Sequence, residues 1–415
     1  MKQLRLAAAV TMAATVALLA PALARADAVS EWNVNATTLI FGLGQGPQIS
    51  VPHLAIVHGA VYDAVNAIDR SREGYLLTSP VGTPFDSKEA AAATAAYRVL
   101  ASLYTTPAQQ ATLATQYAAS LGAISDGPAA KAGGIAVGEA AAAAMIAART
   151  NDGRFGPYRF PVGTLPGEWR PVLPLFVNDP NAWLKDVKPF LVEDPARFMS
   201  KGPNELTSNQ YAREFNEVKA YGSLASTARS DDQTHMARYW AENPPATWSR
   251  VLRRLSAQQA VSLVDNARLF AMAYMSASDA LITVWNDKAK WPFWRPITAI
   301  READTDGNAG TDADPNWVPL IPSPPYPEHS SGHGGLSSAM VRTLQQFFGT
   351  DEIGWTDTNG GGLTRSFTRL SQAIDEVVDA RVWSGIHFRT ADEAGAQIGK
   401  QIAQYAHARY FKPVG

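Results

Sequence analysis

Cysteine is absent from the 415-residue sequence. Its absence excludes disulfide bonds, Cys-ligated zinc, iron–sulfur clusters and a cysteine nucleophile. Charge is also scarce, because charged residues make up 18% of the chain and 36 basic residues stand against 38 acidic ones. A near-neutral chain without a basic block lacks the positive charge on which sequence-independent nucleic-acid binding depends, so we expect no nucleic-acid partner. Hydrophobic residues, at 46%, are abundant enough for a globular protein with a sizeable core.

The first 26 residues have the pattern of an export signal. Lys2 and Arg5 provide a positive start, an apolar run follows over 6–23, and Ala24-Arg25-Ala26 gives a small-x-small cleavage site. A membrane anchor is the competing interpretation, but the apolar run is short for a span and contains a proline. No later segment reaches the roughly 18 uninterrupted apolar residues that a spanning helix needs. We therefore expect a signal peptide over 1–26 and a soluble protein that is secreted or periplasmic.

Helical periodicity dominates the rest of the chain, and alternating runs typical of strands are scarce. The predicted helices cover residues 51–69, 87–103, 128–149, 208–221, 230–240, 255–289, 334–348, 365–384 and 390–410. Nine prolines interrupt residues 154–207, which predicts an irregular connection there. We expect an all-α fold of two packed four-helix-type bundles with long Pro-rich connecting loops. The expected division is an N-terminal helical region with its Pro-rich connection over 27–200 and a second helical domain over 201–415.

One glycine-rich segment resembles a dinucleotide-binding loop. Gly42-Leu-Gly-Gln-Gly46 has the wrong spacing for that loop, and no clear strand–helix unit surrounds it. A flexible turn is the better interpretation.

Three segments in the second half of the chain carry the chemistry. They are Lys288-Ala-Lys-Trp-Pro-Phe-Trp-Arg295-Pro296, His329-Ser-Ser-Gly-His333-Gly334 and Arg381-Val-Trp-Ser-Gly-Ile-His387. Alone, each is typical of an ordinary feature: a solvated face, a helix start or a surface pair. Together they supply several fixed donors and matching positive charge, which binding of a tetrahedral oxyanion requires.

Lys288, Arg295 and Arg381 supply the positive charge, and the two arginines add planar, fork-shaped donors. Lys288 and Arg295 are seven residues apart, close to one helix face, although Pro292 should distort a helix between them. These three side chains are the expected charged part of an anion site.

The uncharged donors come from the second and third segments. Ser331 offers a hydroxyl, and the amides of Gly332 and His333 lie where a helix begins, a position that favours anions. His387 lies six residues after the arginine of its segment, and Gly385 offers a break that would let it turn back. Of the two histidines, one can bond the central atom of the anion and the other can move protons.

A metal-binding protein is an alternative of a different class. His329, His333 and His387 could hold zinc or copper, since imidazoles four residues apart on a helix ligate such ions. The lysine and arginines nearby would repel a cation, which favours the anion site.

The order Lys-x6-Arg-Pro, Ser-Gly-His and Arg-x5-His resembles the signature of the superfamily of vanadium-dependent haloperoxidases and type 2 phosphatidic acid phosphatases (PAP2). The spacings within the three segments match. The stretches His58-Gly-Ala-Val-Tyr-Asp-Ala-Val-Asn-Ala-Ile68 and Pro166-Gly-Glu-Trp-Arg-Pro171 resemble the extended bacterial haloperoxidase-like branch, as does the length. The resemblance covers the chain from about residue 50 to the C-terminus, and it makes 201–415 the expected catalytic domain.

The resemblance implies a role for each matching residue. His387 matches the histidine that bonds vanadium in the peroxidases or attacks phosphorus in the phosphatases, and His333 matches the acid–base histidine. Trp285 lies where haloperoxidases often carry an aromatic side chain near the halide, and it is equally typical of a buried bundle tryptophan. The residues that match those holding the oxygens are Lys288, Arg295, Ser331, Gly332 and Arg381.

Some positions depart from the family pattern. Ser330 replaces the proline before Ser-Gly-His, and Asp392 stands one residue later than the acid that usually follows the liganding histidine. Lys290 competes with Lys288, because it too lies just before the Trp-Arg-Pro of the first segment. His329 is an addition, for which tuning of halide chemistry and a loop hydrogen bond both remain open.

Two functions follow from which anion occupies the site. With vanadate, the resemblance implies an exported haloperoxidase that uses hydrogen peroxide to oxidise halide or a small organic substrate. With a phosphate monoester, it implies an acid phosphatase in which His387 forms a phosphohistidine and His333 protonates the leaving oxygen. The haloperoxidase is the leading interpretation. The halide, the organic substrate and the oligomeric state stay open.

Overall fold

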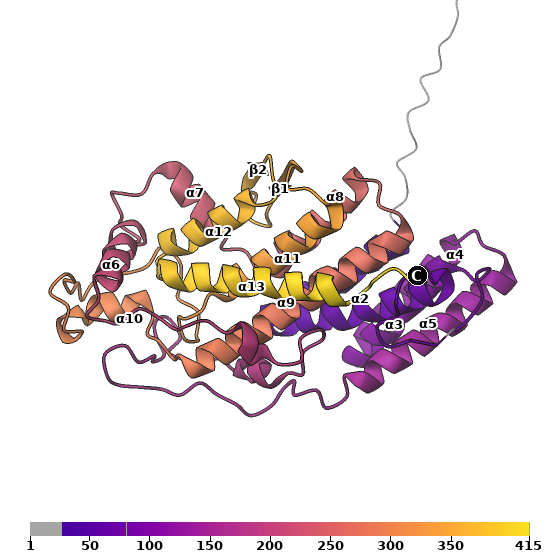
Figure 1. The fold of residues 1–415 in the computed structure, drawn as a ribbon, viewed down its shortest axis with the longest axis horizontal. Coiled ribbons are helices and arrows are strands. Elements are labelled where there is room, and N and C mark those ends of the chain that lie inside the picture. The colour runs from indigo at the N-terminus through magenta and orange to yellow at the C-terminus, as the bar shows by residue number, and fades with distance from the viewer. Residues whose placement is uncertain (1–26, 80, 415) are drawn as a thin grey trace, which may run out of the picture.

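The computed structural model describes residues 27–79 and 81–414, so the expected signal peptide at residues 1–26 lies outside the described residues. Within the described part, thirteen α-helices, three short 3-10 helices and one two-stranded sheet form an elongated molecule (Figure 1). The all-α fold of helical bundles with Pro-rich connecting loops is confirmed.

Five helices form the N-terminal half: α1 (Ala28–Gly42), α2 (Pro47–Asp69), α3 (Lys88–Leu103), α4 (Pro107–Ala123) and α5 (Pro128–Ala148). Asp27 and Ser87 each accept a backbone N–H in the first turn of α1 and α3. Thr106 and Gln109 form a capping box at the start of α4. Helices α3 and α5 are rich in alanine, which favours helix and lets them pack closely on each other and on α2.

Helix α5 is the one described helix that is long and apolar enough to cross a membrane by length and composition. One third (33%) of its most apolar window is buried, and the helix packs along α3 and α2. Core helices of helical bundles share this length and composition, so these properties alone are weak evidence for a membrane span.

Residues 149–208 connect the two halves along the lower edge of the molecule in Figure 1. This connection contains only the 3-10 helices η1 (Ala182–Asp186) and η2 (Pro195–Phe198), as the repeated prolines predicted. The C-terminal half then contains α6 (Asn209–Tyr221), α7 (Asp231–Tyr239), α8 (Pro244–Gln258), α9 (Leu263–Lys290), α10 (Pro296–Arg301), η3 (Ala303–Thr305), α11 (Gly332–Phe348), β1 (Trp355–Thr358), β2 (Thr364–Phe367), α12 (Gln372–Trp383) and α13 (Arg389–Arg409).

Two of the predicted helix ranges are divided in the structure, and several helices were not predicted. The predicted helix 255–289 is the end of α8 followed by α9, because the chain turns at Ala260, which has a positive φ of 48°. The predicted helix 365–384 begins as a strand, where Trp355 of β1 lies opposite Phe367 of β2 and stacks on it at 4.1 Å between ring centroids. Helices α1, α4 and α10 and the first part of α8 were not predicted.

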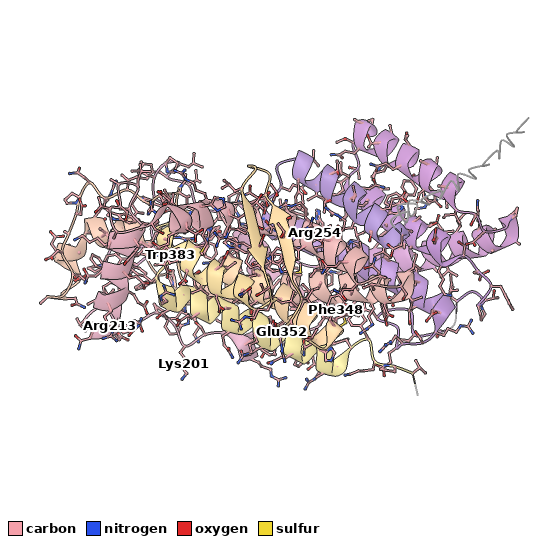
Figure 2. All side chains as sticks on the ribbon, turned by 90° about the horizontal axis from the view of Figure 1, so that it is seen from above. Lys201, Arg213, Arg254, Phe348, Glu352 and Trp383 are labelled. Carbon is pink, nitrogen blue, oxygen red and sulfur yellow. The ribbon has the colours of Figure 1, made fainter. Side chains whose placement is uncertain are left out.

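Helix α9 joins the two halves, because it packs against α2 on one side and against α11 and α13 on the other. Seen from above, the N-terminal helices lie against one end of the C-terminal bundle (Figure 2). Helices α11 and α13 lie very close together: a Cβ on Gly399 would be 2.0 Å from the Gly335 carbonyl oxygen. This packing brings the end of α9, the start of α11 and the loop between α12 and α13 to one place.

Candidate active site

Lys288 lies in the last turn of α9 and is fully buried. Its Nζ donates to the carbonyl oxygens of Pro327 and Glu328, at 2.7 and 3.0 Å, in the segment before α11. Lys290 is exposed, with Nζ 5.0 Å from the centre of the Trp291 ring. The structure therefore places Lys288, and not Lys290, among the buried motif residues.

Arg295 does not continue the helix of Lys288. Helix α9 ends at Lys290, and the following turn is held by the Pro-rich connection: Trp169 N–H donates to the Pro292 carbonyl at 2.7 Å and Trp294 N–H to the Gly167 carbonyl at 3.0 Å. Lys288 and Arg295 therefore do not share a helix face, and the helix is interrupted between them where Pro292 was expected to distort it. Arg295 is fully buried just before α10, and the turn brings it back beside the other motifs.

The second motif begins α11 as expected. Ser331 is the N-cap residue, and its Oγ accepts the Gly334 N–H at 3.2 Å. A Cβ on Gly332 would be 3.0 Å from Cζ3 of Trp285, so a larger residue there would push the indole aside. His333 is buried, with its ring edge-on to Trp240 at 5.9 Å between centroids.

The third motif bends as its glycine predicted. Helix α12 ends at Trp383, and Gly385 has a φ of +79°. A Cβ on Gly385 would be 2.4 Å from the Gly222 carbonyl oxygen, so only glycine suits this turn. After the turn, His387 points Nε2 at Arg295 Nη1, 3.3 Å away, while Arg381 donates from Nη1 to the Trp240 carbonyl at 3.1 Å.

These contacts define the tautomer of His387. A guanidinium can only donate, so Nε2 of His387 must accept from Arg295 and carry a lone pair. Its Nδ1 then carries the proton and donates to Glu328 Oε1 at 2.9 Å. Glu328 Oε1 also accepts the Phe388 N–H at 2.9 Å. The imidazole is thereby oriented with its electron pair toward the cationic side chains.

Sequence reasoning missed Glu328. It is fully buried, and burial raises its pKa to about 8, although Arg295 and Lys288 act in the opposite direction. The available signal was an acidic residue immediately before the histidine-rich second motif, in a region with few acids. A buried carboxylate so placed requires a partner, and His387 provides it.

The cluster holds buried cationic side chains with too little negative charge nearby to stabilise them, and their pKa values are lowered. Burial, and then the neighbouring Arg295, holds the pKa of Lys288 well below its usual value. Burial lowers the pKa of Arg295 to about 10. The pKa values of His387 and His333 lie well below the usual histidine value, first because of burial and then because of nearby cations, Arg295 for His387 and Arg381 for His333. An anion among these groups would offset both causes.

Two buried guanidinium nitrogens of the cluster, Arg295 Nη2 and Arg381 Nε, have no hydrogen-bond partner among the described residues, and His333 Nε2 also lacks one. An unsatisfied buried donor costs about 1–3 kcal/mol, and more when it is charged. A tetrahedral oxyanion carries several acceptor oxygens for such donors. The donor set, together with the lone pair of His387, therefore fits vanadate or phosphate.

Asp392 lies fully buried in the first turn of α13. Burial raises its pKa well above the usual value, while the Ser331 hydroxyl and Arg381 pull it down. Its one-residue displacement from the family pattern thus still leaves it close to the second and third motifs.

His329 makes its hydrogen bond outside the buried cationic cluster. Its Nε2 lies 2.7 Å from Ser200 Oγ and 3.8 Å from Asp287 Oδ2, and burial lowers its pKa to about 3. Residues 27–79 and 81–414 contain no group of three or more His, Asp or Glu side chains arranged to hold a metal ion. The three-histidine cation site considered from the sequence is therefore absent from this part of the chain.

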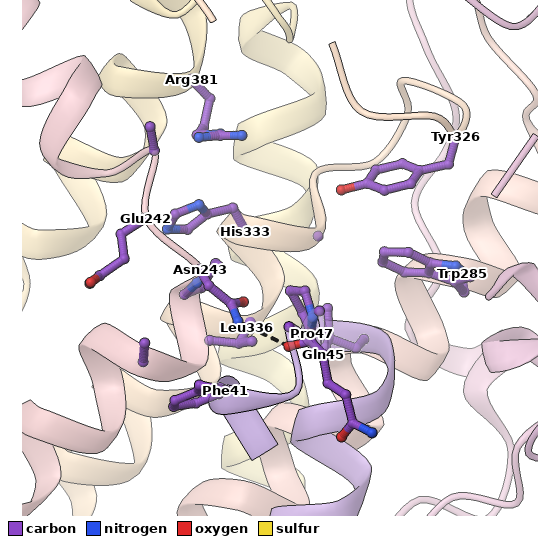
Figure 3. A pocket seen from close by; sticks show the side chains of 17 residues that line it. Phe41, Gln45, Pro47, Glu242, Asn243, Trp285, Tyr326, His333, Leu336 and Arg381 are labelled. Atoms are coloured by element: carbon purple, nitrogen blue, oxygen red, sulfur yellow. Dashed lines mark hydrogen bonds between the residues drawn. The ribbon is translucent and has the colours of Figure 1, made fainter. Parts of the chain in front are cut away.

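A cavity of about 590 Å³ opens beside the cluster (Figure 3). Figure 3 shows Trp285 and Tyr326 along one side and Arg381 and His333 along the other. Trp285 is buried and lines this cavity, with its ring 5.0 Å from that of Tyr326. The turn that includes Gly44, Gln45 and Gly46, predicted to be only a flexible turn, also lines this cavity.

An all-helical protein with a buried cationic cluster around one histidine lone pair defines a class of oxyanion-binding enzyme. Residues 268–415 match the family model described as the VCPO second helical-bundle domain. This match contains all the predicted site residues.

The full-length comparisons agree with the domain match. The chain is 28% identical over 390 residues to the vanadium chloroperoxidase of Curvularia inaequalis, which covers 75% of this chain. It spans 63% of the length of that protein. The resemblance to the vanadium-dependent haloperoxidases expected from the three motifs is confirmed.

Solved structures show the same fold. A bacterial vanadium-dependent iodoperoxidase superimposes with a TM-score of 0.81 at 21% identity, covering 94% of this chain and 97% of that one. An apo-type bacterial vanadium-dependent chloroperoxidase gives a TM-score of 0.70 at 19% identity, with coverages of 88% and 94%. Its holo-type counterpart gives 0.69 at 19% identity, with coverages of 91% and 96%. At sequence identities of 19–21%, these comparisons establish a shared fold.

Proposed function

We propose that the chain is a vanadate-dependent haloperoxidase that oxidises halide with hydrogen peroxide. One observation carries the proposal: His387 presents an Nε2 lone pair to Arg295 at 3.3 Å, within a buried cluster whose cationic donors lack partners. The names of the matched relatives, a fungal chloroperoxidase and bacterial iodo- and chloroperoxidases, support it.

The residues that would hold vanadate are Lys288, Arg295, Ser331, Gly332, His333, Arg381 and His387. Nε2 of His387 is the one electron-pair donor oriented for the central atom, and the charged side chains neutralise the oxygens. When bound, vanadate supplies a Lewis-acidic centre that activates hydrogen peroxide without a change in its own oxidation state. The bound negative charge would raise the pKa of Lys288 and His333 back toward their usual values.

The chain's own side chains handle the proton and the developing charge. His333 is neutral because burial lowers its pKa, so its imidazole can accept a proton from incoming hydrogen peroxide. Lys288 and Arg295 stabilise negative charge on the oxygens, and do so strongly because both are fully buried. Trp285 and Tyr326 form an aromatic wall of the cavity that His333 and Arg381 also line.

The test is an assay of the purified protein under two conditions. The vanadate-loaded protein is given bromide and hydrogen peroxide, and bromination is measured. The vanadate-free protein is given p-nitrophenyl phosphate, and phosphate release is measured. We expect vanadate-dependent bromination. Phosphate release that vanadate blocks, without bromination, would instead identify a phosphatase that uses the same residues.

Substitution of the anchoring histidine is the matched control for this assay. His387→Ala removes the lone pair that faces Arg295 and that would bond the central atom, so we expect bromination to fall to background. His407→Ala changes a partly exposed histidine near the end of α13 and should keep wild-type activity. Equal activity in the two variants would contradict the proposal.

We further propose that the protein is exported. The pattern of residues 1–26 supports this, and N-terminal sequencing of protein recovered outside the cytoplasm tests it. A mature chain that begins at Asp27 is expected. A mature chain that retains residues 1–26 would contradict cleavage.

A further inference from the structure

The Pro-rich connection carries a concentration of exposed apolar side chains. Among residues 27–79 and 81–414, thirteen large apolar side chains are exposed, and six of them fall within residues 162–177. Single exposed apolar residues are ordinary on a protein surface, whereas a contiguous group marks an interaction site. The six residues, called the apolar face below, are Val162, Leu165, Leu173, Leu175, Phe176 and Val177.

Two runs of chain form the apolar face, and hydrogen bonds hold them side by side. Asn178 Nδ2 donates to the Phe160 carbonyl at 2.7 Å, and Asn178 Oδ1 accepts the Phe160 N–H at 3.3 Å. Arg170 Nη2 donates to the Leu165 carbonyl at 2.8 Å. The exposed side chains of the two runs therefore lie close together.

The backbone holds the apolar face outward. Prolines at positions 161, 166, 171 and 174 fix the φ angle at four places in the two runs. The Phe176 N–H donates to the Val172 carbonyl at 3.0 Å, in a turn where Phe176 has a φ of +50°. Leu175 and Phe176 in this turn are 70% and 63% exposed. A surface that is already ordered loses little conformational entropy on binding, which favours association.

A groove adjoins the most exposed part of the apolar face. Its volume is about 180 Å³, and its apolar lining includes Val172, Leu173, Phe176 and Ile297 of α10. Pockets for small organic molecules are usually larger, at roughly 300–1,000 Å³. The groove therefore suits an inserted apolar side chain better than it suits a small organic ligand.

The charges around the apolar face are balanced. Glu168 and Arg170 are the only charged residues in the sequence from 160 to 178. Glu168 accepts two backbone N–H groups of its own turn at 2.9 Å, and Arg170 Nη1 pairs with Glu302 Oε2 at 3.0 Å on the rim of the groove. A strongly acidic or basic partner meets no net opposite charge in this segment. A second copy of the chain brings the same apolar side chains and, around a two-fold axis, an arginine that can face the acid of the other copy.

We propose that the apolar face is the interface of a homodimer in which Leu175 of each copy enters the groove of the other. A protruding apolar side chain and an apolar groove on one surface are what a two-fold symmetric contact requires, because each copy then provides both parts. The interface would include the segment that holds the turn before Arg295, since Gly167 and Trp169 make the hydrogen bonds to that turn. Association of this kind needs no vanadate and does not depend on the haloperoxidase function.

The oligomeric state in solution tests the interface. Sedimentation velocity of the purified protein should give twice the mass of one chain. Leu175→Asp places a charge in the apolar groove and should weaken association by at least ~30-fold, so that the variant sediments as a monomer at the same concentration. Leu224→Asp is the matched control, because Leu224 is 58% exposed but lies outside the apolar face, and this variant should remain a dimer. Circular dichroism should give the wild-type helix content for both variants, since both side chains are exposed in a single copy.

The absence of cysteine permits a second test. Leu175→Cys gives each copy a single thiol, and a short bismaleimide should join two copies through it. Leu224→Cys should remain largely unjoined. Equal cross-linking at the two positions would contradict the interface.

Three results of the sedimentation experiment would overturn the proposal. One is a wild-type protein that sediments as a monomer, and another is a Leu175→Asp variant that remains a dimer. The third is a monomer that binds phosphatidylcholine vesicles and loses this binding in Leu175→Asp, which would identify the apolar face as a surface for lipid.

Discussion

The two halves of the molecule each contain a fully paired buried carboxylate, and both contrast with the cationic cluster at the end of α9. In the N-terminal half, Asp63 of α2 accepts three consecutive backbone N–H groups, those of residues 75–77, at 2.6, 2.8 and 3.3 Å. In the C-terminal half, Asp279 of α9 accepts those of residues 190–192, at 2.7, 2.7 and 2.9 Å. Both carboxylates are buried, and each fastens a loop to the middle of a helix.

The end of α9 departs from this pattern. There Arg295 is as deeply buried as Asp279, but its Nη2 has no partner among the described residues, and the same holds for Arg381 Nε. Buried charge with complete pairing maintains the structure, whereas buried charge with incomplete pairing marks the place where a ligand is required. Arginines elsewhere also have an unpartnered nitrogen, but they are only partly buried, so burial and incomplete pairing together give a criterion for the site that does not depend on family resemblance.

Removal of cluster arginines should give the largest effect. Arg295→Ala should weaken vanadate binding by at least ~100-fold, because a buried charge-assisted bond to the anion is lost. Isothermal calorimetry on the vanadate-free protein measures this. Arg149→Ala is the matched comparison, since Arg149 is buried but donates to Asp152 at 2.9 Å and to the Lys188 carbonyl at 2.6 Å.

We expect Arg149→Ala to lower stability and to leave vanadate affinity unchanged. Wild-type vanadate affinity in both Arg295→Ala and Arg381→Ala would show that the incompletely paired donors do not face the anion.

Substitution of the two loop-fastening carboxylates should cost stability in both halves. Asp63→Asn and Asp279→Asn each replace an acceptor oxygen with a donor opposite backbone N–H groups. We expect each to lower the free energy of unfolding by about 2–4 kcal/mol, measured by urea denaturation. The exposed Asp126→Asn is the control and should change it little. A neutral result for one of the two buried positions would show that the loops are not fastened in the same way.

The pH dependence of stability should distinguish the buried carboxylates further. Burial raises the pKa of Asp279 to about 6 from 3.8, with the backbone hydrogen bonds acting against the rise. An acid whose pKa is higher in the folded than in the unfolded chain loses stability as pH rises between the two values. The wild type should therefore lose up to ~3 kcal/mol from this group between pH 4 and pH 6. The asparagine of the Asp279→Asn variant does not titrate between pH 4 and pH 6. The difference in the free energy of unfolding between wild type and variant, measured by urea denaturation, should therefore become smaller over this range. If this difference in the free energy of unfolding grows as the pH rises, the pKa of Asp279 is not raised in the folded chain.

The sequence predicted the site residues better than their surroundings. Lys288, Arg295 and His387 could be recognised because each lies in a short local motif whose spacing is visible along the chain. Their arrangement was less predictable, since the turn before Arg295 is held by Trp169 and Gly167 from the distant Pro-rich connection. Helical periodicity likewise located most helices but missed the break at Ala260, where an alanine adopts a positive φ that its sequence does not signal.

Glu328 was missed for a physical reason. Glu328 meets His387 across 59 residues, and the Asn243–Gln45 hydrogen bond spans 198 residues in the same way. Such contacts are set by helix packing, and no local pattern records them. Completeness of hydrogen bonding in the folded chain is what reveals them.

Substitution of Glu328 should give the smallest effect on vanadate affinity. It also tests whether this buried carboxylate belongs to the site or only to the structure. Glu328→Ala removes the acceptor of His387 Nδ1–H, which frees the imidazole to rotate or change tautomer. Loss of such a supporting partner typically weakens binding at the central atom by 10–100-fold, and we expect about tenfold for vanadate, measured by calorimetry. Glu328→Gln retains an acceptor oxygen and should recover most of the affinity, whereas a purely electrostatic role would leave the glutamine variant as weak as the alanine variant. If both variants bind vanadate as tightly as wild type, the orientation of His387 must come from its backbone alone, and the paired carboxylate belongs with Asp63 and Asp279 as a structural fastening.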